Sequence, residues 1–169
     1  FPHRLDRPVG GILVVALTKK AARLLSSQFE VRKVRKEYVA ALAGRHPTEA
    51  TRWVDHLRKI PDQARVEIAE PGSDSAKPAE TGVEFIRYDE GSDRTWVRLR
   101  PVTGRMHQLR VQAASRGFPI LGDLIYGGPP LSGLRENEIA LRAQSLWFFD
   151  PRNSKEVSVT ASDDWIESV

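Results

Sequence analysis

Strand and helix patterns meet within one stretch, residues 95–110, which reads TWVRLRPVTGRMHQLR. Apolar and basic residues alternate over residues 95–102, which predicts a strand with one apolar and one basic face. The apolar set is Val97 and Leu99, and the other set is Trp96, Arg98 and Arg100. Helical periodicity follows over residues 106–116 and stops at Gly117, as a glycine cap would. A strand, a tight turn and a helix are therefore expected in direct succession.

Further elements are expected on both sides of this stretch. A strand over residues 82–89 precedes it, and the turn residues 90–93 make the two strands an antiparallel pair. The other expected elements are strands at 10–17, 37–42, 139–149 and 156–161, a helix at 19–34, and a hairpin arm of short strands within 45–80. Many strands with two sizeable helices predict an α+β fold with a mixed, largely antiparallel sheet and a few packed helices.

Length and composition narrow the class of protein. The 169 residues suffice for one ordinary domain, 1–169. Hydrophobic residues make up 40% and charged residues 28%, which excludes disordered and fibrous architectures. The apolar runs are short and no signal-peptide pattern is present, so a soluble protein without a membrane partner is expected. The absence of cysteine excludes disulfide scaffolds, thiolate zinc sites and cysteine nucleophiles, and it agrees with a cytoplasmic location.

Charge alternates in blocks along the chain. Residues 1–45 carry a net charge of +7 and residues 94–135 carry +6, whereas residues 46–93 and 136–169 carry −5 and −4. Arginine supplies 19 of the 26 basic residues, and it is suited to phosphate contact and to stacking on bases. The basic blocks form a polyanion-binding face if they converge, or a mixed surface if each pairs with an acidic neighbour. Composition alone leaves both outcomes open.

Two places carry candidate chemistry. Within residues 2–11 the carboxylate of Asp6 lies between Arg4 and Arg7, just before paired glycines that allow a tight turn or close approach by a ligand. Such an aspartate stays ionised and serves as a nucleophile, a base or a simple ion-pair partner. Within residues 103–110 the free N–H groups of a helix start, two arginines and a glutamine suit a phosphate or a carboxylate.

Other templates find little support in the sequence. No Walker loop, dinucleotide-binding GxGxxG, HExxH or EF-hand loop is present, and the four histidines are scattered. A metal-dependent nuclease that uses His3, Asp6 and His107 is kept as an alternative enzyme class. A protein-binding scaffold is the least favoured alternative.

Several segments, taken in order, carry a more specific pattern. Residues 3–6 read HRLD, residues 36–38 read Lys-x-Tyr after the expected helix, and residues 100–110 read RPVTGRMHQLR. Residues 117–127 continue the third segment with GFPILGD and YG. In this order and spacing they resemble the HRLD, K-x-Y and third motifs of the RluA class of pseudouridine synthases. The end, Leu141-Arg142-Ala143 through Asp164-Trp165, is similar to the closing strands of that family.

The resemblance implies isomerisation of a uridine within RNA. The N-glycosidic bond breaks, the uracil turns, and a carbon–carbon bond forms to the same sugar carbon. Asp6 is then the catalytic nucleophile, which attacks the sugar C1′ or assists formation of a glycal. Arg110 is expected to pair with Asp6 within ~4 Å, and Tyr38 to stack on the uracil and move the C5 proton. No metal, cofactor or nucleotide is implied.

The same resemblance implies a central basic cleft that binds ribosomal or transfer RNA. The target uridine has to leave its stack, and Arg4 matches the wedge that holds the distorted RNA open. Leu141 matches an apolar residue that lies near the base. The residues expected to contact RNA are Arg4, Arg7, Arg32, Arg35, Arg98, Arg100, Arg105, His107 and Gln108.

The chain departs from the family pattern in three respects. Val9-Gly10-Gly11 stands where the family commonly has Thr-Ser-Gly, and Leu141-Arg142-Ala143 stands where it commonly has Leu-His-Ala. Family members also carry several dozen residues before HRLD. Residues 1–169 are therefore expected to lack the N-terminal strands of the catalytic domain, and the exposed sheet edge invites dimerisation. A catalytically inactive RNA-binding relative is kept as the alternative function.

Overall fold

The computed structural model describes residues 1–162 and Trp165. Its elements are β1 (Gly10–Gly11), α1 (Lys19–Glu30), β2 (Arg35–Ala43), β3 (Arg52–Lys59), β4 (Val66–Ala69), β5 (Lys77–Asp89), β6 (Arg94–Pro101), α2 (Gln108–Ser115), the 3₁₀ turn η1 (Leu124–Tyr126), β7 (Leu141–Phe149) and β8 (Glu156–Thr160). Asp164 lies outside the described residues. None of the helices in the described part is long and apolar enough to cross a membrane.

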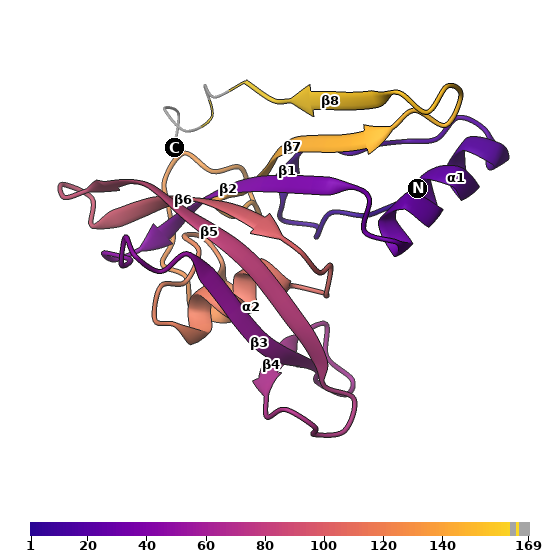
Figure 1. Cartoon of the computed structure of the whole chain (residues 1–169). Coiled ribbons are helices and arrows are strands. Elements are labelled where there is room, and N and C mark those ends of the chain that lie inside the picture. The colour runs from indigo at the N-terminus through magenta and orange to yellow at the C-terminus, as the bar shows by residue number, and fades with distance from the viewer. Residues whose placement is uncertain (163–164, 166–169) are drawn as a thin grey trace.

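One sheet contains the strands, in the order β1-β7-β2-β6-β5-β3-β4, and β8 pairs with β7 beside this path. The β1–β7 pair is parallel, and the pairs of β2, β3, β5 and β8 with their neighbours are antiparallel. In Figure 1 the sheet twists strongly, so that β7 and β2 cross the upper half while β5 and the β3–β4 hairpin descend below α2. The predicted α+β fold with a mixed, largely antiparallel sheet is confirmed, and so is the hairpin arm.

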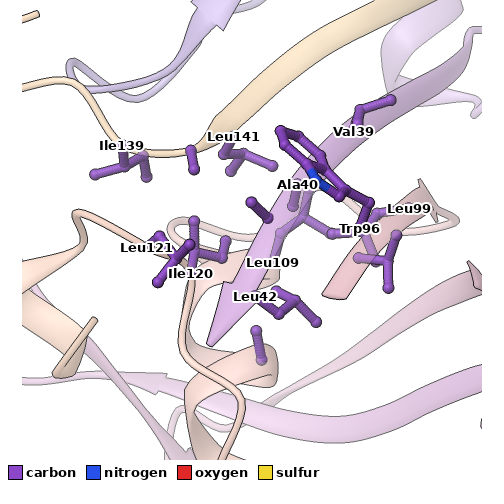
Figure 2. Packing of buried hydrophobic residues seen from close by; sticks show 14 of the residues in the cluster. Val39, Ala40, Leu42, Trp96, Leu99, Leu109, Ile120, Leu121, Ile139 and Leu141 are labelled. Carbon is purple, nitrogen blue, oxygen red and sulfur yellow. The ribbon is translucent and has the colours of Figure 1, made fainter. Parts of the chain in front are cut away.

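The hydrophobic core lies where β2 and β6 face the start of α2 and the loop that follows it. Leu42, Trp96 and Leu99 are fully buried there, and Ile120 and Leu141 close the cluster (Figure 2). Burial of each such side chain contributes about 1.5–3 kcal/mol. The packed middle of the sheet therefore supports the turn after β6 and the start of α2.

The expected strand over residues 10–17 is wrong beyond Gly11. The N–H of Ile12 still donates to the carbonyl of Ala143 at 3.0 Å, but the N–H of Val14 donates to Nε2 of His3 at 3.1 Å. The chain therefore leaves the sheet after two paired residues. The β-branched run forms an exposed connection to α1, with Leu17 94% exposed.

Both helices are shorter than their periodicity predicted. The helix expected at 19–34 ends at Glu30, because Arg32 adopts a left-handed φ of 57° and breaks the helical path. The helix expected at 106–116 starts at Gln108, because His107 has a φ of 49°. Gly117 has a φ of 82° directly after α2, so the predicted glycine cap is confirmed.

The two faces of β6 are less distinct than the alternation predicted. Trp96 was expected on the basic face, but its side chain is fully buried. It packs edge-on against Trp165 at 5.7 Å, and the guanidinium groups of Arg87 and Arg94 each lie 5.8 Å from its ring. Cation–π contacts of this kind cover an aromatic residue that would otherwise face water.

Gly11 is where the first segment meets the sheet. It adopts a φ of 108°, and a Cβ at this position would clash with the carbonyl oxygen of Ala143 and lie 2.7 Å from its nitrogen. The close approach that the paired glycines suggested is thus made by the backbone of the chain's own β7. Because Gly11 follows Asp6 by five residues, this contact fixes the path of the segment that carries the aspartate.

Gly11→Ala is expected to lower the free energy of unfolding by about 2–4 kcal/mol, through left-handed strain plus overpacking against β7. Urea denaturation measures the change. Gly91→Ala is the matched control, because a Cβ there meets its nearest side-chain atom at an ordinary 3.5 Å. Equal stability of the two variants would contradict the proposed anchoring of the first segment at Gly11.

Candidate active site

A cavity of about 560 Å³ lies between the first segment and the start of α2. Its wall includes three groups of residues that are far apart in the sequence. They are His3 to Asp6, residues from the end of α1 and from β2, and the turn 101–107 with the start of α2. The two segments that the sequence singled out therefore meet at one hollow.

His3 anchors the HRLD segment to α1. Its ring stacks on Phe29 at 4.6 Å between centroids, and Nε2 accepts the N–H of Val14 at 3.1 Å. Burial, and secondarily the charge of Lys36, lower the pKa of His3 to about 4, so the ring is neutral at neutral pH. Since Nε2 is engaged by the backbone, His3 acts as a structural prop for the loop that carries Asp6.

Asp6 faces two nitrogen-bearing side chains of the TGRMHQLR segment. The guanidinium Nη1 of Arg110 lies 3.7 Å from Oδ2 of Asp6, which confirms the expected proximity across 104 positions. The imidazole Nε2 of His107 lies 4.0 Å from the same oxygen. Asp6 keeps 30% of its side chain exposed, whereas Arg110 keeps 2%. The carboxylate therefore borders the cavity with a buried cation behind it.

Arg110 has a closer partner that the sequence did not reveal. Its Nε and Nη2 donate to the two carboxylate oxygens of Asp123, each at 2.7 Å. The Asp123 side chain is 1% exposed, so both charges are removed from water. Burial opposes the charge of Arg110, but the hydrogen bonds and charge of Asp123 outweigh it and raise the pKa of Arg110. Asp123 stands in the quoted GFPILGD run, which was the available signal.

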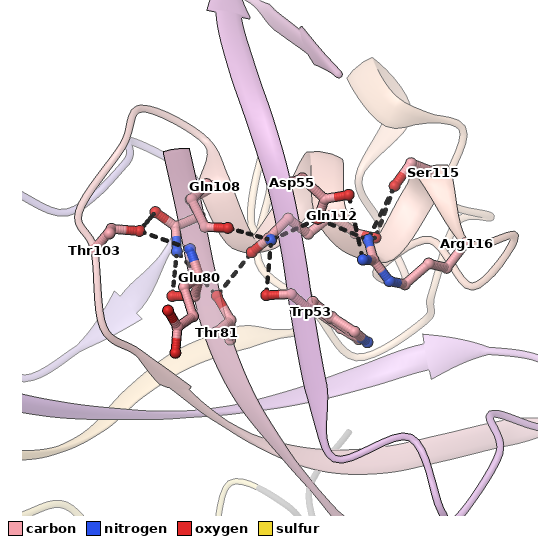
Figure 3. Close-up of polar contacts among 10 residues, drawn as sticks. Trp53, Asp55, Glu80, Thr81, Thr103, Gln108, Gln112, Ser115 and Arg116 are labelled. Carbon is pink, nitrogen blue, oxygen red and sulfur yellow. Dashed lines mark hydrogen bonds and ion pairs between the residues drawn. The ribbon is translucent and has the colours of Figure 1, made fainter. Parts of the chain in front are cut away.

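Two glutamines tie α2 to its surroundings: Gln108 holds the turn before the helix, and Gln112 bonds β3 and β5 (Figure 3). Oε1 of Gln108 accepts the Thr103 hydroxyl at 2.7 Å and the Arg105 N–H at 3.0 Å, and Nε2 donates to the Glu80 carbonyl and the Thr81 hydroxyl. Figure 3 shows Gln112 one turn further along, bonded to Thr81 and Asp55. Gln108 was expected to contact RNA, but its four hydrogen-bonding positions are occupied within the chain.

Tyr38 and Leu141 line the cavity from neighbouring strands. Tyr38 pairs with Leu99 of β6 and, after a register shift, with Ala143 of β7. Burial, and then the charge of Asp6, raise the pKa of Tyr38 to about 12. Its hydroxyl is therefore protonated at neutral pH. Leu141 is 3% exposed and also belongs to the hydrophobic core.

Three of the predicted RNA contacts are neutralised by carboxylates. Arg98 and Arg100 both pair with Glu37 and Glu84, at 2.6–3.2 Å, across three adjacent strands. Arg35 pairs with Glu156 at 2.7 Å. At these three positions the basic residues pair with acidic neighbours and form a mixed surface, which is one of the two outcomes that the charge pattern left open.

Other basic side chains border the cavity. Arg4, Arg32 and Arg105 line it as cations, His107 lines it with a lowered pKa, and Arg7 is exposed nearby in the sequence. Lys36 also lines the cavity and was missed by the sequence analysis. Burial lowers its pKa, and within the described residues no ion pair involves it. A partly desolvated lysine without a counter-charge favours the binding of an anion.

A metal centre has no geometric basis in the described residues. No group of three or more metal-ligating side chains comes together in that part of the chain. His3, which the nuclease alternative requires, already accepts a backbone N–H through Nε2.

Comparison with known proteins identifies the family. Residues 1–115 match the sequence profile described as RNA pseudouridylate synthase. The dual-specificity RNA pseudouridine synthase RluA of Escherichia coli K12 is 38% identical over 164 residues, which cover 96% of this chain and 73% of that protein. The ribosomal large subunit pseudouridine synthase C of Buchnera aphidicola is 30% identical over 173 residues, covering 97% of this chain and 53% of that protein.

A solved structure agrees with these sequence matches. The human RNA pseudouridylate synthase domain containing 1 has a TM-score of 0.75 and 32% identity, over 96% of this chain and 68% of that one. Profile, sequence and fold thus define a class of RNA-modifying isomerases. The chain belongs to the RNA pseudouridylate synthase family, within its RluA class.

Asp123→Ala is expected to lower the free energy of unfolding by about 3–5 kcal/mol, because it leaves the buried Arg110 without its partner. Urea denaturation measures the loss. The matched control is Glu156→Ala, which removes the exposed partner of Arg35 and should cost at most ~1 kcal/mol. If both variants lose equally little, the Arg110–Asp123 pair does not have the stabilising role assigned to it.

Proposed function

We propose that this chain converts specific uridines of structured ribosomal or transfer RNA to pseudouridine, with Asp6 as the nucleophile and with the target base flipped into the cavity. The observation that carries the proposal is the Asp6 carboxylate at the cavity wall, backed by the buried guanidinium of Arg110 at 3.7 Å. The names of the RluA and synthase C relatives, which specify RNA and the large ribosomal subunit, support the choice of substrate.

The reaction needs a carboxylate that is charged and pointed at the sugar. An oxygen of Asp6 attacks C1′, the C1′–N1 bond breaks, and the uracil leaves with the electron pair. After the ring turns, C5 attacks C1′ and the bond to Asp6 breaks. The C5 proton is then lost, and N1 takes up a proton from solvent. A covalent step of this kind divides one difficult displacement into two easier ones. Assistance of glycal formation is the other route open to Asp6.

Tyr38 is suited to hold the base. Its ring borders the cavity that Leu141 also lines, and aromatic rings stack on bases regardless of sequence. With a pKa of about 12, its hydroxyl is a neutral hydrogen-bonding group at neutral pH. It moves the C5 proton only in a step in which its own proton leaves at the same time.

The partial burial of the nucleophile supports base flipping. Asp6 is 30% exposed at the wall of a cavity of about 560 Å³, which favours access by an extruded uridine over one stacked in a helix. Extrusion costs a few kcal/mol of unstacking, which contacts to the distorted RNA have to offset. Arg4 is exposed at the cavity and is suited to occupy the space that the base vacates.

Tritium release from RNA that carries [5-³H]uridine tests the chemistry. The wild-type chain is expected to release tritium from ribosomal or transfer RNA, and Asp6→Asn to release none above background while still binding RNA. Asp74→Asn, on an exposed loop, is the matched control and should keep full activity. Release by Asp6→Asn at the wild-type rate would exclude Asp6 as nucleophile. RNA binding without release by any variant would favour the inactive RNA-binding relative.

Lys36→Met tests whether Lys36, the cavity lysine without an ion pair among the described residues, contacts RNA. Loss of one phosphate contact is expected to weaken binding uniformly across RNA sequences and to reduce the slope of log affinity against log salt by about 0.7–0.9. Filter binding between low and moderate salt, in the Asp6→Asn background, measures both quantities without turnover. Lys155→Met removes an exposed lysine that does not line the cavity, and it should leave the slope unchanged. An unchanged slope for Lys36→Met would remove Lys36 from the RNA contacts.

A further inference from the structure

Tyr126 is a buried tyrosine next to the active site that the chemistry above does not use. It closes η1, and its side chain is 8% exposed. Its hydroxyl lies 3.0 Å from the backbone nitrogen of Val66, 3.3 Å from the carbonyl oxygen of Val66, and 3.0 Å from Nδ1 of His107. A hydroxyl has one proton to donate, so only one of its two acceptors can receive it.

His107 joins this hydroxyl to the nucleophile. Its ring stands at 90° to the ring of Tyr126, with centroids 5.7 Å apart, and its Nε2 lies 4.0 Å from Oδ2 of Asp6. The left-handed φ of 49° at His107 is uncommon outside glycine. At this residue one imidazole nitrogen lies against Tyr126 and the other lies toward Asp6.

The imidazole carries a single N–H. Burial, and then the charge of Arg110, lower the pKa of His107, although Asp6 and Asp123 oppose the shift. A neutral ring is protonated on Nδ1 or on Nε2, and the hydrogen bond made by one nitrogen decides which.

Electrostatics distinguishes the two arrangements. If the hydroxyl donated to Val66, Nδ1–H would donate to the hydroxyl, and the lone pair of Nε2 would face the Asp6 carboxylate. If the hydroxyl donates to Nδ1, the Val66 N–H donates to the hydroxyl, and Nε2–H faces the carboxylate. Both arrangements use the 3.0 Å contact between the hydroxyl and Nδ1, and the second gives up the longer, 3.3 Å bond from the hydroxyl to the Val66 carbonyl. In exchange, the second arrangement replaces the repulsion between the Nε2 lone pair and the Asp6 carboxylate, 4.0 Å apart, by an attraction.

We propose that Tyr126 is a positioning residue, which donates its hydroxyl proton to Nδ1 of His107 and so holds the His107 proton on Nε2, facing Asp6. This inference rests on the proposed role of Asp6 as nucleophile. Arg110 Nη1 and His107 Nε2 both approach Oδ2. At 3.7 and 4.0 Å these are electrostatic contacts rather than hydrogen bonds, and they favour Oδ1 as the oxygen that attacks C1′. The neutral His107 adds a polar N–H beside Oδ2 without supplying a titrating charge.

The tautomer of His107 is measurable without RNA. In ¹⁵N-histidine-labelled protein, long-range proton–nitrogen correlation spectra distinguish the nitrogen that bears the proton from the one that does not, and His107→Gln assigns the signal. The wild-type protein is expected to show the Nε2–H form. Tyr126→Phe should convert it to a mixture of tautomers, while Tyr88→Phe, which removes a hydroxyl bonded to Asp93 on an exposed turn, should not. A wild-type Nδ1–H form overturns the proposal whatever any variant does.

Kinetics separates positioning from general destabilisation. Tyr126→Phe is expected to lower kcat by about 10- to 100-fold, the range seen when the hydrogen-bond partner of a metal-ligating histidine is removed, with KM for RNA unchanged. His107→Gln retains an amide N–H near the position of Nε2 and should keep more activity than His107→Leu. Adding Tyr126→Phe to His107→Gln should lower kcat no further, because the hydrogen bond between Tyr126 and His107 is already absent.

Two results would overturn the assignment of Tyr126. One is a pure Nε2–H form of His107 in the Tyr126→Phe variant. The other is that Tyr126→Phe lowers kcat by the same factor in the His107→Gln variant as in the wild-type protein. Failure of Asp6 as nucleophile would appear separately, as tritium release by Asp6→Asn, and would leave the tautomer measurement unaffected.

Discussion

The buried ion pair between Arg110 and Asp123 is the constraint on which the arrangement of the site depends. Two hydrogen bonds of 2.7 Å fix the guanidinium plane, and only Nη1 remains to face Asp6. A buried cation of this kind is tolerated only when a carboxylate balances it. The loop that carries Asp123 therefore has to pack against α2 before Asp6 can have a defined electrostatic environment.

The site is built from segments that the sheet brings together. The HRLD loop is anchored by Gly11 on β7 and by the contact of His3 with α1, whereas Arg110 stands on a helix held by Gln108 and Gln112. Neither the loop with Asp6 nor the helix with Arg110 forms the site alone. The short separation between Asp6 and Arg110 thus depends on the packing of the central strands, in which Trp96 and Leu99 are fully buried.

Much of this architecture could be predicted from periodicity, and the failures have physical causes. The antiparallel pair before α2, the hairpin arm and the glycine cap follow from local patterns. The run after Gly11 has strand composition, but Val14 finds its backbone partner in a side chain, which no periodicity reports. The neutralisation of Arg98 and Arg100 depends on the register of three strands. Asp123 stood within a quoted motif, yet its contact spans a loop whose path the sequence does not specify.

The turn η1 has a consequence for protein engineering. One turn of chain separates Asp123, which holds Arg110, from Tyr126, which contacts His107, so both side chains that face Asp6 are held from the same place. Residues 103–110 and 122–128 consequently behave as a single cassette. A laboratory that redirects this scaffold toward another RNA should graft the two segments together and keep Val66 of β4, whose N–H meets the Tyr126 hydroxyl. A mismatch between the two segments would misalign the nucleophile without changing any residue that meets the substrate.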